Sequence, residues 1–439
     1  MTGHGCSGGS GSWKGSVLCR TGHNQRAQMA NFRIECERIS EWHWLANARG
    51  YGTGFGTAGG ASEEEAITSI RQMAAQMRDK PSGIQNPAML KLVDAILGLE
   101  TSEEAAVHSW IVDVLGQPLP AEGEAVTFGA TQAAMRDGVL TFADEHEAGQ
   151  EQTSEAFGFK WGKRDTYSSP DVRANQIKWL DERFGGRSVM SYLGNSPEHP
   201  VVLDAGCGAG FSGELAFRDD LSRIRYIGAD ISTAVEIARQ TIAPLAHESL
   251  FISSDLTKLP FRPGSLDVIF SEGVLHHTPS TKNAFNSLVP FLKPGGIFAF
   301  YVYNKKGAIR EFTDDFLRDI FVEMKPEDAW EAMKPITQLG IALGEISAKV
   351  KIREDIPVLG IKKGEIDVQR LFYWSVLKAY YRPEFSFDEM NHINFDWFTP
   401  RYAFRQTPEE VRAWVEEAGL AVDRLHHEEA GITVVARKP

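Results

Sequence analysis

Residues 201–210, VVLDAGCGAG, decide the fold class of this chain. The apolar run 201–203 predicts a short strand that is buried in a parallel sheet. The glycines at positions 206, 208 and 210 allow the next turn to bring its backbone against a ligand before a helix begins. A strand, a glycine turn and a helix in this order predict a nucleotide-binding corner.

The size and charge of the chain restrict its partners. At 439 residues it exceeds what one hydrophobic core usually fills, so we expect two domains. The formal net charge of −13 argues against a surface built to neutralise phosphates. No stretch approaches the roughly 18 apolar residues that cross a bilayer. We therefore expect a small-molecule substrate, no nucleic acid and no membrane, and no feature indicates the oligomeric state.

The four cysteines predict neither a disulfide framework nor a metal site. They stand at positions 6, 19, 36 and 207, which is too few and too irregular for a set of bridges. No CxxC or HxxxH pair supplies the usual zinc spacing, so we expect no metal. Free thiols are typical of a reducing compartment, and we expect a cytoplasmic protein.

The first 150 residues carry no sign of the corner. Residues 1–30 include a Gly/Ser-rich run without apolar periodicity, and we expect them to be disordered. Residues 31–150 are expected to be mainly helical, because apolar residues recur at helical intervals over 31–45 and a serine cap precedes an apolar face within 62–77. The glycine-laden stretch 51–60 is expected to be a loop.

After the corner, strands and helices alternate. This pattern predicts an α/β fold with a doubly wound, Rossmann-like sheet joined by right-handed crossovers. The segments 420–429 and 431–438 are separated by a single residue, so they are expected to pair as an antiparallel hairpin. A helix that begins at a capping box, Thr407 to Glu410, precedes them. The other strands are predicted at 225–230, at 248–256, within 265–277 and at 295–304.

About a hundred residues, 305–405, separate the fifth strand from the final helix, where a minimal domain needs only a short connection. Insertions at the carboxyl edge of a sheet often carry binding specificity. Helical periodicity over 309–321 and aromatic residues over 371–404 lead us to interpret the insertion as a substrate cap. Before the corner, aromatic residues within 157–167 follow a predicted linker at 143–156; they either pack or fold over the corner as a lid.

Two aspartates occupy strand ends, where ligands of open α/β sheets bind. Asp230 follows the second strand and is placed to accept both hydrogen bonds of a ribose diol. Asp255 follows the third and is placed to accept from an adenine amino group. The third glycine, Gly210, comes one position too early for the G-x-G-x-x-G pattern of dinucleotide sites, so no pyrophosphate is expected.

Five features in order resemble the class I S-adenosylmethionine-dependent methyltransferases over roughly residues 155–439: DAGCGAG, the two acids, the loop after the fourth strand and LKPGG at 292–296. The resemblance is closest to a group with an LHHT-type loop, here residues 275–278. It implies a seven-stranded sheet with an antiparallel last hairpin, and S-adenosylmethionine as the cofactor.

The resemblance also implies which residues bind the cofactor. The glycine turn would face the methionine portion, the two acids the ribose and the adenine, and the loop 271–273 the methionine carboxylate or the reactive methyl. An aromatic residue before the first strand, Phe157 or Trp161, would cover it. The implied cofactor-binding residues are Asp204, Ala205, Gly206, Gly208, Asp230, Ile231, Asp255, Leu256, Ser271, Glu272 and Trp161.

Methyl transfer from a sulfonium is a direct displacement, so the protein mainly aligns donor and acceptor, which contributes about 7 to 11 kcal/mol. A general base is needed only for a protonated nucleophile. His276 and His277 are the candidate catalytic residues for that role, or they simply pack in their loop. Rings with a polar handle would suit a planar, aromatic or cationic acceptor, or they form the cap's own core; these residues, with one arginine among them, are Tyr301, Tyr303, Arg310, Tyr373, Trp374, Tyr380, Tyr381, Trp397 and Tyr402.

The sequence therefore predicts an enzyme, an S-adenosylmethionine-dependent methyltransferase that acts on a small molecule. The alternative is a catalytically silent S-adenosylmethionine-binding module whose cap docks a protein partner. In either case residues 151–304 and 406–439 are expected to form the cofactor-binding domain, and 305–405 the cap.

Overall fold

The structure, a computed structural model, describes part of the chain in detail. The described residues are 14–17, 32–40, 43–50, 53–60, 68–69, 72–76, 110–129, 131–143, 147–194 and 197–439. The chain divides into two compact units, Met1–Val112 and Asp113–Pro439. Most of the segment predicted to be disordered, 1–30, lies outside the described residues.

In the first unit four strands form an antiparallel sheet in the order β1 (Lys14–Val17), β2 (Phe32–Ser40), β3 (His43–Gly50) and β4 (Thr53–Gly60). The helix predicted over 31–45 and the loop predicted over 51–60 are therefore wrong. Because β2, β3 and β4 follow one another after two-residue connections, antiparallel ladders form between neighbours, and β3 holds even the glycine-rich β4 by backbone pairing. Within 62–77 the described helical residues are 68–69 and 72–76.

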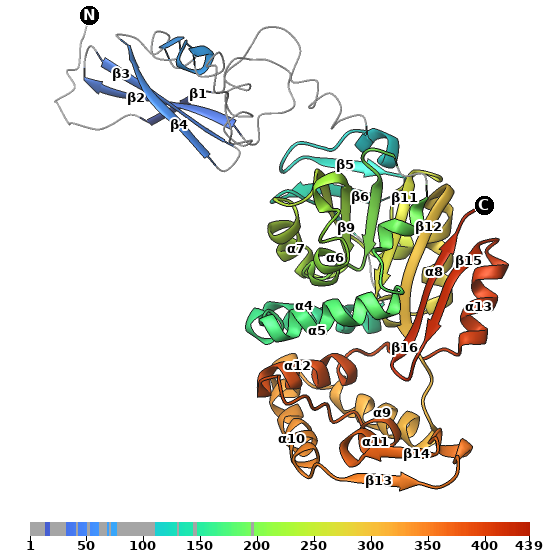
Figure 1. Ribbon diagram of the computed structural model, residues 1–439. Helices are drawn as coiled ribbons and strands as arrows, with labels where there is room; N and C mark the ends of the chain where they lie inside the picture. The colour runs from blue at the N-terminus through green and yellow to red at the C-terminus, as the bar shows by residue number, and fades with distance from the viewer. Residues whose placement is uncertain are drawn as a thin grey trace, which may run out of the picture. The chain divides into compact units, whose positions relative to one another are not determined.

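The second unit is built on a ten-stranded mixed sheet (Figure 1). Its parallel centre follows the predicted alternation, and the antiparallel hairpin at the end of the chain is confirmed, since β16 pairs antiparallel with both β12 and β15. From the hairpin inward the strands are β15 (Ala421–His427), β16 (Gly431–Arg437), β12 (Leu292–Tyr303), β11 (Leu266–Glu272), β8 (Val201–Ala205), β9 (Arg225–Asp230) and β10 (Glu248–Ser253).

Three further strands extend the sheet beyond β10. They are β7 (Val139–Phe142), which pairs parallel with β10, and the antiparallel β6 (Thr131–Arg136) and β5 (Ala125–Phe128). The implied count of seven strands is thus corrected to ten, and the mainly helical character predicted for 31–150 is wrong here too. An uncovered β10 would expose a row of backbone donors and acceptors, and β7 pairs with that edge. The sheet-bearing unit therefore begins near residue 113, ahead of the predicted boundary at 151.

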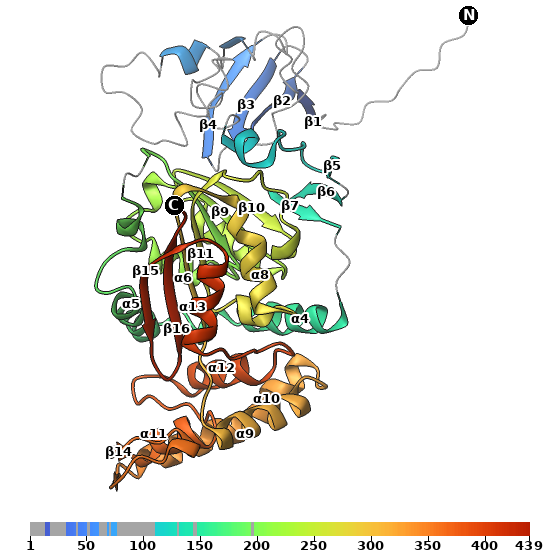
Figure 2. The same cartoon turned by 90° about the vertical axis from the view of Figure 1, so that its right-hand side faces the viewer.

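Helices cover both faces of this sheet (Figure 1 and Figure 2). The segment predicted as a linker, 143–156, instead contains the start of α4. The capping box predicted at Thr407 and Glu410 is confirmed at the start of α13. The helices outside the cap are α4 (Ala148–Gly162), α5 (Pro170–Arg183), α6 (Phe211–Ala216), α7 (Ala234–Ile242), α8 (Thr281–Leu288) and α13 (Pro408–Glu417). Short 3-10 helices connect them at Arg164–Thr166, Val189–Leu193, Leu221–Arg223, Leu256–Lys258, Leu275–His277 and Val289–Phe291.

Residues 305–405, called the cap below, lie together beyond one end of the sheet, with α4 between them and the sheet (Figure 1 and Figure 2). Their helical character agrees with the sequence pattern, and a two-stranded hairpin is added. A buried aromatic cluster that includes Trp330, Phe395 and Trp397 packs the cap against Tyr301 and Tyr303 of β12. The cap elements are α9 (Ala308–Phe321), α10 (Pro326–Glu345), β13 (Lys349–Ile352), Pro357–Leu359, β14 (Gly364–Asp367), α11 (Val368–Ser375) and α12 (Phe387–Phe398).

Helix α9 turns its apolar stripe away from the protein. The side chains of Phe312 and Phe316 are 73% and 59% exposed, whereas Arg310, Asp314 and Arg318 are buried. The periodicity over 309–321 therefore predicted the helix but not which face is buried. Among the described residues, no helix combines the length and the apolar character needed to cross a membrane.

Candidate functional site

A cavity of about 600 Å³ opens at the carboxyl ends of the central strands, between the sheet, α4 and the cap. A ligand pocket of a small molecule falls in this size range. Its wall brings together most residues implied to bind the cofactor, namely Trp161, Gly206, Gly208, Asp230, Ile231, Asp255, Leu256 and Glu272.

The turn after β8 admits only glycine at two positions. Gly206 and Gly208 have φ values of +83° and +51°. A Cβ added to Gly206 would lie 2.2 Å from a methyl group of Val274, and one added to Gly208 would lie 2.7 Å from Nε1 of Trp161. The backbone of the turn therefore packs directly against Val274 and Trp161, and all four residues line the cavity.

Asp230 fastens the turn and lines the cavity. Its Oδ2 accepts from the Gly208 N–H at 2.8 Å, and its Oδ1 accepts from the N–H and the hydroxyl of Ser232 at 2.8 and 2.6 Å. Burial raises the pKa of Asp230, while these hydrogen bonds oppose the shift. A carboxylate has about four acceptor positions, so Asp230 keeps capacity for a ligand hydroxyl.

Three implied contact residues, Asp204, Ala205 and Ser271, lie behind the cavity wall. Asp204 accepts from the Tyr226 hydroxyl at 2.5 Å, and burial raises its pKa to about 7 despite that bond. The Ser271 hydroxyl donates to the Ala205 carbonyl at 2.9 Å. Their side chains tie β8 to β9 and β11 beneath the site.

Glu272 and Asp255 line the cavity from two other strand ends. Glu272 forms a buried ion pair with Arg183 at 2.6 Å, and among the described residues its Oε2 has no hydrogen-bond partner. Burial raises the pKa of Glu272, and Arg183 opposes the shift. The Oδ1 of Asp255 accepts from the N–H and the hydroxyl of Thr257, both at 2.8 Å, which fixes the strand end beside Leu256.

Helix α4 places Trp161 over the glycine turn, and Lys160 beside it joins the helix to the cap. The Nζ of Lys160 lies 2.6 Å from Oδ1 of Asp396 and 4.0 Å from the Trp161 ring centre. Burial acts to raise the pKa of Asp396, but Lys160 and Lys378 hold it below its usual range. His392 adds a second link through a 2.7 Å hydrogen bond with Thr166. Sequence reasoning missed these polar links.

The two candidate histidines differ in position. His277 lines the cavity, and its Nδ1 is 2.5 Å from the Tyr402 carbonyl, so that nitrogen carries the proton and Nε2 is the free acceptor among the described residues. Burial lowers the pKa of His277 to about 4. His276 is fully buried against Tyr303 and is not part of the cavity wall.

The rings singled out in and near the cap divide between cavity and core. The rings of Tyr303 and Trp397 pack at a tilt of 38° with their centres 4.4 Å apart, and both are buried while lining the cavity. Tyr381 and Tyr402 are outside the wall. The other members that line it are Tyr301, Arg310, Tyr373, Trp374 and Tyr380.

Comparisons with known proteins agree with this geometry. Residues 203–300 match the methyltransferase domain family. The chain carries a class I S-adenosylmethionine-dependent methyltransferase domain. An uncharacterised chloroplastic methyltransferase of Arabidopsis thaliana is 32% identical over 129 residues, which are 27% of this chain and 36% of the relative. Sterol 24-C-methyltransferase of Candida albicans is 29% identical over 115 residues, which are 26% and 30% of the two chains.

The chain spans about a third of the length of these curated relatives. Among solved structures, magnesium protoporphyrin IX methyltransferase of Synechocystis, with bound S-adenosylhomocysteine, is 14% identical, with a TM-score of 0.36, over 66% of this chain and 98% of that one. The fold assignment therefore rests on the strand order and the matched domain.

The cofactor of the methyltransferase domain family fits the residues that are present. The glycine turn presents bare backbone at the cavity wall, and Glu272 in the same wall has a buried oxygen without a hydrogen-bond partner among the described residues. Asp230 offers acceptor positions at the end of β9. Together they provide a backbone surface and two carboxylates for a ligand that carries a ribose and an ammonium group.

Proposed function

We propose that the whole chain is an S-adenosylmethionine-dependent methyltransferase that acts on a small-molecule acceptor held against the cap. The observation that carries this proposal is the continuity of the cavity. One space is lined by the glycine turn and Asp230 of the methyltransferase domain and by Tyr373 and Trp397 of the cap. Donor and acceptor sites thus adjoin, as a direct displacement requires.

Within this proposal, Asp230 with Ile231 binds the ribose, Asp255 with Leu256 binds the adenine, and Gly206 and Gly208 face the methionine portion. Glu272 borders the amino-acid end, where its free oxygen accepts from an ammonium group. S-adenosylmethionine supplies an activated methyl group on a sulfonium. Trp161 covers the turn and excludes water, and the Lys160–Asp396 pair holds α4 against the cap.

His277 is the base in this proposal when the acceptor arrives protonated. Its pKa lies below neutrality, so its imidazole is neutral at pH 7, and Nε2 is an unpartnered acceptor among the described residues. His276 packs against Tyr303 in this proposal and takes no part in proton transfer. Assignment to the LHHT-loop group, the cap boundaries at 305 and 406, and a cytoplasmic location remain predictions from the sequence.

The test is turnover with the full chain. Purified protein is incubated with S-adenosylmethionine and chromatographic fractions of a metabolite extract, and S-adenosylhomocysteine is measured. We expect one or a few fractions to raise its release severalfold over the cofactor alone. Cofactor binding without release in any fraction would contradict the enzymatic proposal.

A second candidate is the catalytically silent module whose cap docks a protein partner. The exposed face of α9, with Ile309, Phe312, Phe316 and Ile320, favours it, because exposed apolar patches mark interaction sites. Absence of turnover together with tight cofactor binding would support this candidate instead.

A further inference from the structure

Three cationic side chains lie over one indole ring in the cavity wall. The Nζ of Lys378 is 4.4 Å from the ring centre of Trp397, the guanidinium carbon of Arg310 is 5.4 Å from it, and the Nζ of Lys306 is 5.6 Å from it. All four residues line the cavity. The cap side of the cavity is thus cationic as well as aromatic.

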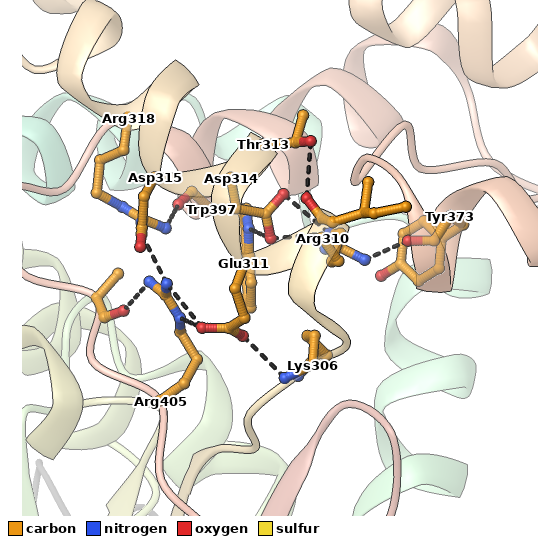
Figure 3. A network of polar contacts seen from close by, with 12 residues as sticks. Lys306, Arg310, Glu311, Thr313, Asp314, Asp315, Arg318, Tyr373, Trp397 and Arg405 are labelled. Atoms are coloured by element: carbon orange, nitrogen blue, oxygen red, sulfur yellow. Dashed lines mark hydrogen bonds and ion pairs between the residues drawn. The ribbon is translucent and has the colours of Figure 1, made fainter. Parts of the chain in front are cut away.

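Three arginines of this region, Arg310, Arg318 and Arg405, are paired with carboxylates, as Figure 3 shows. The Nε of Arg310 is 2.8 Å from both oxygens of Asp314. Arg318 and Arg405 share Asp315, at 2.9 and 2.6 Å. Their charges are therefore compensated within the protein.

Lys378 has no such partner. Its side chain is 7% exposed, and among the described residues its Nζ has no hydrogen-bond acceptor and no ion-pair partner. Two carboxylates act on it electrostatically, Asp396 and Asp314. Asp396 is already paired with Lys160 at 2.6 Å, and Asp314 with Arg310. Within the described part of the chain, the ammonium group of Lys378 therefore lies at the cavity without an ion pair of its own, since both carboxylates are paired with other residues.

Lys306, near the start of the cap, also lacks an ion pair in the part of the chain that the structure describes, but it does have hydrogen-bond acceptors. Its Nζ donates to the carbonyls of Asn304 and Ala430, and it has no ion pair with a carboxylate among the described residues. Burial, with Arg310 nearby, lowers the pKa of Lys306 to about 7, and burial likewise lowers that of Lys378 to about 7. An anion beside them would raise both pKa values again.

A buried ammonium without a partner costs several kcal/mol, and an anion in the cavity would offset that cost. We propose that Lys378, supported by Lys306, binds a carboxylate or phosphate group of the acceptor, so that the substrate is a small anionic molecule. This inference rests on the proposed function. Of the planar, aromatic and cationic acceptors that the rings would suit, the cationic class is disfavoured, because two lysines without ion pairs among the described residues would repel it.

The test measures ligand binding to the full chain by calorimetry. The probes are benzoate, its uncharged analogue benzamide, and inorganic phosphate, and S-adenosylmethionine is titrated separately. The variants are Lys378→Met, which keeps the length of the side chain without its charge, and Lys306→Met. The matched control is Lys362→Met, whose side chain in the β13–β14 hairpin is 85% exposed.

We expect the wild-type protein to bind benzoate or phosphate more tightly than benzamide. Lys378→Met should lower the affinity for the anion about tenfold or more, because a desolvated charge pair is lost. Binding of S-adenosylmethionine and of benzamide should be unchanged, and Lys362→Met should bind like the wild type. Tighter binding of benzoate indicates a carboxylate substrate, and tighter binding of phosphate a phosphorylated one.

Wild-type binding of both benzoate and phosphate that is no tighter than binding of benzamide, or unchanged anion binding in both Lys378→Met and Lys306→Met, would overturn the inference. Its failure is distinct from failure of the proposed function. If the wild type binds no S-adenosylmethionine but still binds anions through Lys378, the anion site stands and the methyltransferase proposal falls.

Discussion

Replacing Lys378 by methionine is expected to stabilise the protein at pH 7, although it removes a binding group. Burial, opposed by Asp396 and reinforced by Arg310, lowers the pKa of Lys378 from 10.5 to about 7. At about 1.4 kcal/mol per pKa unit, this shift corresponds to roughly 5 kcal/mol against the charged form. Because relaxation and water entry reduce such penalties in real proteins, we expect a gain of about 2 to 4 kcal/mol in the free energy of unfolding.

The sign of the pH dependence follows from proton uptake. Between about pH 7 and pH 10.5 the unfolded lysine binds a proton that the folded one has lost, so wild-type stability rises with pH in this window. The advantage of Lys378→Met is therefore largest at or below pH 7 and shrinks toward pH 10. Urea unfolding followed by far-UV circular dichroism at pH 7 and pH 9.5 measures it. The exposed Lys362→Met should stay within about 0.5 kcal/mol of wild type. A Lys378→Met protein that is less stable at pH 7, by an amount independent of pH, would refute the reasoning.

Three further predictions concern the cofactor and the base. Asp230→Asn is expected to weaken binding of S-adenosylmethionine about tenfold or more, since charge-assisted hydrogen bonds are lost. Wild-type affinity of this variant, measured by calorimetry, would contradict the role of Asp230. Gly206→Ala should abolish cofactor binding, because its Cβ would lie 2.2 Å from Val274 and displace the turn. The control Gly264→Ala, at φ +68° with no atom within 4 Å, should bind the cofactor normally. Equal cofactor binding by both variants would argue against a role of the glycine turn. His277→Ala should lower kcat about a hundredfold without changing cofactor affinity. The wild-type kcat should fall only below about pH 4, where His277 becomes protonated. An unchanged kcat in His277→Ala would leave alignment of donor and acceptor as the whole mechanism.

The centre of the sheet could be predicted from the sequence because its signals are local. The apolar run, the glycine turn and the acid at Asp230 are each a signal within one βα unit, and the structure places the turn and Asp230 at one cavity. The last hairpin was predictable because only three residues, 428–430, separate its strands, too few for a parallel crossover. These features depend on short-range geometry that composition and spacing reveal.

The edges of the sheet were not predictable in the same way. β7 joins the sheet by pairing with β10, more than a hundred residues later, and no periodicity signals such a partner. In α9 an apolar stripe indicated the helix, but Arg310 and Asp314 are buried as a pair while Phe312 is exposed. Burial of a charge depends on its partner, which the local pattern does not contain.

The polar links of the site were missed for a related reason. Lys160 stands among aromatic residues in FGFKWGKRDTY, and only the aromatic residues were interpreted, as packing or as a lid. Its partner Asp396 is 236 residues away. Lys378 was missed because an ammonium group without an ion pair is recognised only when the surroundings of its side chain are known. A lysine between the aromatic residues of 371–404 was the only available signal.

The most direct test of the central claim is a calorimetric titration of the purified full chain with S-adenosylmethionine and with S-adenosylhomocysteine. We expect one site per chain for each ligand, with micromolar or tighter affinity, and loss of that site in Gly206→Ala but not in Gly264→Ala. Absence of heat for both ligands with correctly folded wild-type protein would contradict it.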